Sequence, residues 1–125
     1  MAPFDVKLFN QAKCFEDDPN VVQPDILVIC DRERITKEGR YEGIPALVVE
    51  ILSASTKRKD LIKKLDLYMN SGVNEYWIVN PETEEIVLHY FENRDFHTSR
   101  TFLAGQTMHS VAFAGLSVEL DQVFQ

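Results

Sequence analysis

The sequence predicts an α/β (α+β) fold, in which a mixed central sheet carries one main helix after its second core strand. Two apolar stretches, residues 25–29 and 47–52, are typical of strands that are buried on both faces. A segment with helical spacing follows the second stretch, and alternating segments separated by turn residues come after it. We expect residues 1–125 to form one domain, because this length supports a single core of ordinary size.

The composition is that of a globular protein, with 45% hydrophobic and 26% charged residues and a net charge of −7. This charge argues against a protein that coats nucleic acid non-specifically, although it is compatible with a local basic patch. No apolar run approaches the roughly 20 residues that span a bilayer, and no signal peptide is recognisable. We therefore expect a cytoplasmic protein, in which Cys14 and Cys30 are free thiols.

The N-terminal third is expected to contain an edge strand, a loop and the first core strand. Residues 4–9 alternate weakly like an edge strand, and residues 11–20 are polar and end in turn chemistry. Residues 21–30 follow as a strand, with Pro24 confined to its start because proline cannot donate to the ladder. Residues 31–45 are charged and contain glycine, which indicates a connection or lid before the second core strand at 47–53.

One helix is expected next, because Leu61, Leu65 and Tyr68 recur at helical spacing. Ser55 or Thr56 can cap its start, and residues 70–72 (Asn-Ser-Gly) are a typical C-terminal stop. Residues 73–80, 86–91 and 96–103 then predict an antiparallel meander, and the C-terminus predicts a strand end that leads into a helical turn from Leu120.

The acids within the two apolar stretches are the main indication of function. Glu50 lies in the middle of one stretch and Asp25 opens the other. A buried carboxylate without a partner costs several kcal/mol, so a strand that keeps one usually uses it. Lys64 falls between Leu61 and Tyr68 in helical phase and therefore points inward, towards the strand that carries Glu50. We expect Asp25, Glu50 and Lys64 to come together.

Two interpretations of this group remain open from the spacing alone. Two acids at the ends of neighbouring strands can bind Mg²⁺ or Mn²⁺, while a lysine orients a water or stabilises charge on a phosphoryl group. Alternatively, Glu50 forms a purely structural ion pair with Lys64 or Arg58, and Asp25 only caps the start of its strand.

Three segments, QPDILVI, GIPALVVEILSAST and KRKDLIKKLDLYMNSGVNEYWIVNPE, occur in an order that resembles the Uma-type family of restriction endonucleases in the PD-(D/E)xK nuclease superfamily. The resemblance covers residues 4–85 and implies a restriction-endonuclease-like fold and Mg²⁺- or Mn²⁺-dependent hydrolysis of DNA. It makes Pro24-Asp25 the PD element and Glu50 the second acidic ligand. Leu52 stands where the strand lysine is usual, so Lys64 would be that lysine, moved to the helix. Asp60 also matches a family position.

The sequence departs from the family pattern in three places. The chain starts after the family's N-terminal helical segment, so we expect a shortened domain, and Ala46 and Ala54 replace an acid and a proline. A catalytically inactive module that serves in binding or oligomerisation is therefore the alternative function.

Partners can also be anticipated from the sequence. Basic residues at the helix start, Lys57, Arg58 and Lys59, would contact the DNA backbone, although such a charge run can equally be a solvated face. We expect a homodimer, because nucleases that cut both strands often work as twofold pairs.

Overall fold

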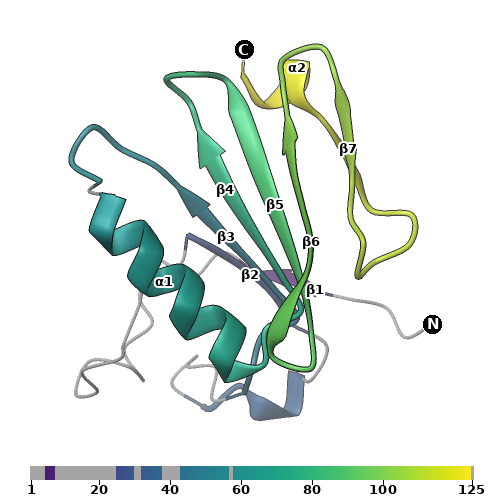
Figure 1. Ribbon diagram of the computed structural model, residues 1–125. Helices are drawn as coiled ribbons and strands as arrows, with labels where there is room; N and C mark the ends of the chain where they lie inside the picture. Colours follow the sequence, from purple (N-terminus) through teal and green to yellow (C-terminus); the bar gives the residue numbers. More distant parts are fainter. Residues whose placement is uncertain (1–4, 8–24, 30–31, 38–42, 57, 125) are drawn as a thin grey trace.

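The computed structural model describes residues 5–7, 25–29, 32–37, 43–56 and 58–124. These residues form a six-stranded sheet, a long helix that lies against it and a smaller two-stranded sheet (Figure 1). In chain order the elements are β1 (Asp5–Lys7), β2 (Ile26–Ile29), a 3-10 helix (Arg32–Arg34), β3 (Leu47–Ile51), α1 (Arg58–Ser71), β4 (Glu75–Asn80), β5 (Glu85–Glu92), β6 (Asp95–Phe102), β7 (Thr107–His109), β8 (Ser117–Glu119) and α2 (Leu120–Val123).

The large sheet is mixed, as the sequence predicts. Its strand order is β1-β2-β3-β4-β5-β6, so the two predicted core strands lie inside the sheet and β1 lies at an edge. The neighbours β3 and β4 are parallel and are connected by α1, whereas all other neighbouring strands of this sheet are antiparallel. A parallel pair needs a long crossover connection, and the helix supplies it.

Strands β2 and β3 are buried on both faces because their alternate residues enter two different apolar clusters. Leu27, Ile29 and Val48 belong to the cluster beneath α1, together with Tyr68 of the helix itself. Val28, Leu47 and Val49 belong to the opposite cluster, which also contains residues of β7 and α2. Three layers result, with α1 on one side of the sheet and the C-terminal segment on the other (Figure 1).

Helix α1 begins at Arg58 and ends at Ser71, close to the predicted limits. Its last turn is followed by Gly72, which adopts a left-handed backbone conformation with φ of 95°. This conformation is the usual helix stop, and Val73 N–H closes it by donating to the carbonyl of Tyr68 at 3.1 Å. The chain then turns directly into β4.

Strands β4, β5 and β6 form the predicted meander. The turn between β5 and β6 contains Asn93 and Arg94, both with positive φ, which is the geometry of a tight hairpin turn. The C-terminal prediction is also confirmed, since β8 leads directly into the helical turn α2. The sequence interpretation missed β7, a strand of only three residues that pairs with β8.

Several of the predictions concern residues that the structure does not describe, namely the loop at 11–20, Cys14, Cys30, Pro24 and Lys57. Within the predicted connection at 31–45, residues 32–34 form a 3-10 helix. None of the helices in the described ranges is long and apolar enough to cross a membrane.

Candidate active site

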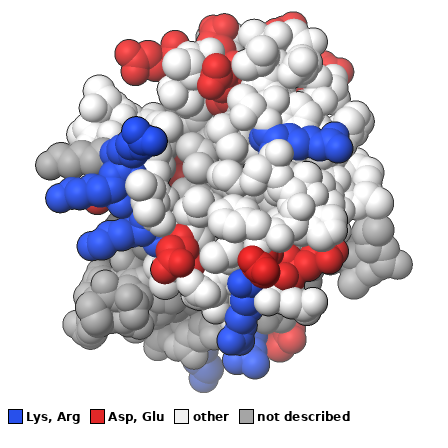
Figure 2. Space-filling model, in the orientation of Figure 1, with Lys and Arg blue, Asp and Glu red and all other residues white. Residues whose placement is uncertain are grey.

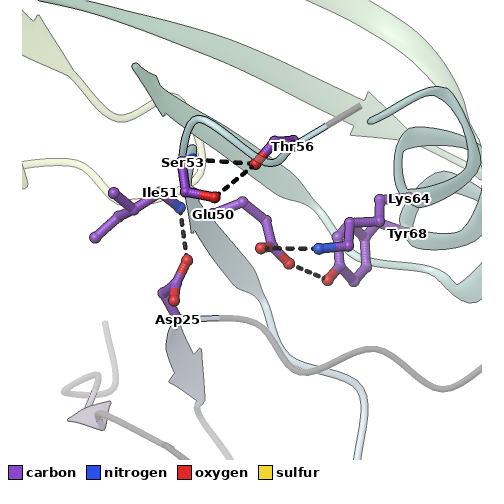
Figure 3. Close-up of polar contacts among 7 residues, drawn as sticks. All are labelled: Asp25, Glu50, Ile51, Ser53, Thr56, Lys64 and Tyr68. Atoms are coloured by element: carbon purple, nitrogen blue, oxygen red, sulfur yellow. Dashed lines mark hydrogen bonds and ion pairs between the residues drawn. The ribbon is translucent and has the colours of Figure 1, made fainter. Parts of the chain in front are cut away.

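Glu50 is buried near the end of β3 and receives two hydrogen bonds from α1. Its residue surface is only 5% exposed. Tyr68 Oη donates to Glu50 Oε1 at 2.7 Å, and Lys64 Nζ donates to Glu50 Oε2 at 3.2 Å (Figure 3). Lys64 and Tyr68 are one helical turn apart and lie on the same side of α1. The inward phase of Lys64 is therefore present as predicted, whereas the hydroxyl contact of Tyr68 was not foreseen.

Asp25 lies beside Glu50, immediately before β2. In the antiparallel register Ile26 pairs with Val49, so Asp25 reaches the neighbourhood of Glu50 on the adjoining strand. Asp25 Oδ2 accepts a hydrogen bond from Ile51 N–H at 2.6 Å (Figure 3). The three residues singled out in the sequence thus come together around the end of β3, and their catalytic role remains a prediction.

The electrostatic environment does not favour the ionised form of Glu50. Burial raises the pKa of Glu50 above its ordinary value of 4.5, and the nearby charge of Asp25 acts in the same direction. The Tyr68 hydrogen bond and the charge of Lys64 lower this pKa, but they do not cancel the effect of burial. Burial, followed by the charge of Glu50, also raises the pKa of Tyr68, so its hydroxyl remains a donor. A carboxylate kept at a net cost beside a second one is typical of a functional site.

The observed contacts also agree with the alternative in which Glu50 and Asp25 have purely structural roles. Glu50 forms an ion pair with Lys64, while Arg58 is exposed, and Asp25 does hold the start of its strand to β3. These bonds stabilise the sheet and helix whether or not the protein is an enzyme. Glu75, the other buried acid among the described residues, provides a comparison.

Glu75, at the start of β4, is a buried acid that the sequence interpretation did not single out. It is completely buried. Each of its two oxygens accepts two hydrogen bonds at 2.6–2.9 Å, from Val111 N–H, Ala112 N–H, Trp77 Nε1–H and the Ser110 hydroxyl. A carboxylate has about four acceptor positions, so those of Glu75 are all used and fasten the C-terminal loop to the sheet. Among the described residues, Glu50 accepts two hydrogen bonds, one on each oxygen.

The turn between β3 and α1 is lined by hydroxyl groups. Thr56 Oγ1 accepts a hydrogen bond from Ser53 N–H at 3.0 Å, and Ser53 Oγ lies 3.0 Å from Ser55 Oγ. These contacts close the turn itself, and the helix begins at Arg58, two residues after Thr56. The Thr56 hydroxyl, one of the two predicted helix caps, is therefore used inside the turn.

Basic side chains gather at one side of the molecule, over α1 (Figure 2). Arg58, Lys59 and Lys63 are all exposed on this helix, as expected for a solvated face. Contact with DNA is compatible with this placement and remains a prediction.

Other aromatic residues and a histidine of the large sheet take part in packing. Tyr76 and Trp77 are buried in the sheet and belong to its two apolar clusters. His89 packs parallel to Phe91, and burial lowers the pKa of its imidazole. Within the described residues, no three His, Cys, Asp or Glu side chains converge as metal ligands.

A solved structure identifies the class of fold. One structural match is a chain described as a "putative nuclease belonging to DUF820" from Anabaena variabilis, with a TM-score of 0.65 and 19% identity. The match covers 82% of this chain and 59% of that chain. The architecture is therefore a nuclease-like α+β fold.

The family follows from the sequence comparison. The model of the Uma2 family, described as "Putative restriction endonuclease", matches residues 5–121, and the chain belongs to this family. A curated relative, the uncharacterized protein slr1290 of Synechocystis sp., is 39% identical over 77 residues, which are 61% of this chain. The matched part spans 40% of the relative's length.

Proposed function

We propose that this protein is an endonuclease that hydrolyses DNA phosphodiester bonds and depends on Mg²⁺ or Mn²⁺. Asp25 and Glu50 are its metal ligands, and Lys64 is its third catalytic residue. The observation that carries this proposal is the pair of acceptor positions that no described residue uses on Glu50, a buried carboxylate next to a second one. Membership of the Uma2 family supports it.

The residues present fit a hard divalent cation. Asp25 and Glu50 offer only carboxylate oxygens, the ligands that Mg²⁺ prefers, and a site with two carboxylates is sufficient because Mg²⁺ usually keeps several waters. When bound, such a cation polarises the phosphoryl group and lowers the pKa of a bound water. Burial and, to a lesser extent, the charge of Asp25 raise the pKa of Glu50, and a bound cation would favour the ionised carboxylate against both effects.

Lys64 is suited to act on the substrate because its side chain is 30% exposed, while its partner Glu50 is buried. Its ammonium group can donate three hydrogen bonds, and Glu50 is its hydrogen-bond partner among the described residues. We assign to Lys64 the orientation of the attacking water or the stabilisation of charge on the phosphoryl oxygens.

Arg58 and Lys59, together with Lys57, would contact the DNA backbone next to the active site. These contacts would make binding weaken with salt, because each neutralised phosphate releases counterions. Cleavage of both strands would require two active sites, so we propose that the protein acts as a homodimer. We also propose that it acts in the cytoplasm.

The test is a cleavage assay on supercoiled and linear DNA with Mg²⁺ or Mn²⁺. Glu50→Ala should abolish divalent-dependent cleavage and retain a folded protein by circular dichroism. A matched control is Asp66→Asn, which alters an exposed acid of α1 and should cleave like the parent. Equal cleavage by Glu50→Ala and the parent would refute the proposal. A protein that folds, binds DNA and never cleaves it would instead be the inactive binding module.

A further inference from the structure

The two donors that hold Glu50 differ in how firmly they are fixed. Tyr68 is 4% exposed, and its bond to Oε1 is the shorter, at 2.7 Å. The side chain of Lys64 is 30% exposed, and its bond to Oε2 measures 3.2 Å. A lysine ends in a flexible four-carbon chain, whereas a buried tyrosine has few alternative positions. Oε1 therefore has a permanent partner and Oε2 an exchangeable one.

Packing fixes the ring of Tyr68. It contacts Tyr76 of β4 edge to face, with ring centroids 4.9 Å apart and planes inclined by 65°. Both rings belong to the apolar cluster beneath α1, which includes Leu27, Val48 and Phe91. To withdraw its hydroxyl from Glu50, Tyr68 would have to leave this cluster, since side chains in a close-packed interior occupy defined rotamers.

We propose that Tyr68 is the positioning residue of the metal site: it holds Oε1 of Glu50 in place and so keeps Oε2 available to the cation when Lys64 turns to the substrate. This inference rests on the proposed function and adds a residue to it. Hydrogen-bonded partners of metal ligands typically contribute about 10–100-fold to metal affinity or activity. Tyr68 touches neither cation nor substrate and acts only through Glu50.

The same cluster supplies a matched control. The hydroxyl of Tyr76 is buried and has no hydrogen-bond partner among the described residues. Tyr76→Phe and Tyr68→Phe therefore remove the same atom from neighbouring, equally buried rings, but only the second change breaks a bond to Glu50. A general effect of losing a buried hydroxyl would appear in both variants.

The experiment is a calorimetric titration with MnCl₂ of the full chain and two variants. Tyr68→Phe should weaken Mn²⁺ binding by about 10–100-fold, and Tyr76→Phe should leave it unchanged. In cleavage, saturating Mn²⁺ should restore the rate of Tyr68→Phe, which a misfolded protein would not show.

Two results would overturn the inference. They are unchanged Mn²⁺ affinity in folded Tyr68→Phe and an equal loss of affinity in Tyr76→Phe. Each of these leaves the proposed function standing if the parent binds Mn²⁺ through Glu50. Absence of any Glu50-dependent binding in the parent would instead refute the proposed function, and the inference with it.

Discussion

Changing each of the two buried acids to glutamine should have very unequal consequences for stability. Glu75→Gln should lower the free energy of unfolding by about 3 kcal/mol, whereas Glu50→Gln should change it by less than about 1 kcal/mol. The substitution is the same in chemistry and volume at both positions. The difference in stability comes from the number of hydrogen bonds that each carboxylate accepts.

At Glu75 a glutamine cannot satisfy all four donors. If its carbonyl oxygen faces the N–H groups of Val111 and Ala112, its NH₂ group meets the indole N–H of Trp77, which can only donate. A buried donor left unpaired costs about 1–3 kcal/mol, and the remaining bonds lose the assistance of the negative charge. The opposite orientation leaves two backbone donors unpaired. The sum is about 3 kcal/mol in the better orientation.

At Glu50 a glutamine keeps the bond from Tyr68 and removes a charge that burial disfavours. Its NH₂ group would face Lys64, but that side chain is partly exposed and can turn to water. Loss of the ion pair and loss of the desolvation cost therefore offset each other.

Urea denaturation of both variants, with the parent as reference, measures these differences. A change in midpoint at unchanged slope is read directly as a change in stability. Equal stability of the two variants, or a larger loss at Glu50, would show that counting acceptor positions does not distinguish a structural acid from a functional one.

Three further predictions concern the site and its helix. Lys64→Met should reduce DNA cleavage by about 10²–10³-fold without weakening Mn²⁺ binding in calorimetry, because the ammonium acts on substrate charge and is not a ligand; a parallel loss of binding would contradict this role. The pH dependence of stability should reflect Glu50: its raised pKa favours the folded state fully below the unfolded value of 4.5, and this contribution is lost as pH rises through the folded pKa. Urea titrations across that range should therefore show the parent losing stability relative to Glu50→Gln, and parallel curves would exclude such a shift. Gly72→Ala should cost about 1–2 kcal/mol through its positive φ, while Ser71→Ala should be nearly neutral; a neutral Gly72→Ala would mean the helix ends differently.

The sequence was sufficient for the elements that have strong periodicity or turn chemistry. The helix limits followed from Leu61, Leu65 and the Asn-Ser-Gly stop, and the inward phase of Lys64 followed from the same spacing. The two core strands were recognisable because both faces are buried. In each case a local pattern carried the information.

Other features depend on contacts that are distant in sequence. Three of the four donors to Glu75 are 35–37 residues away, and only Trp77 is a local one, so the burial of Glu75 leaves little local signal. The strand β7 has three residues and is defined by its partner β8. The Tyr68 hydroxyl contact could have been inferred, since Tyr68 follows Lys64 by one turn, but the residue was assigned to the apolar stripe alone.

Titration of the folded protein with MnCl₂, in parallel for the parent, Asp25→Asn and Glu50→Gln, tests the central claim most directly. The account predicts one binding event in the parent that both substitutions abolish or greatly weaken, together with loss of DNA cleavage and little change in unfolding free energy. Unchanged Mn²⁺ binding in both variants, or cleavage that persists without these carboxylates, would contradict it.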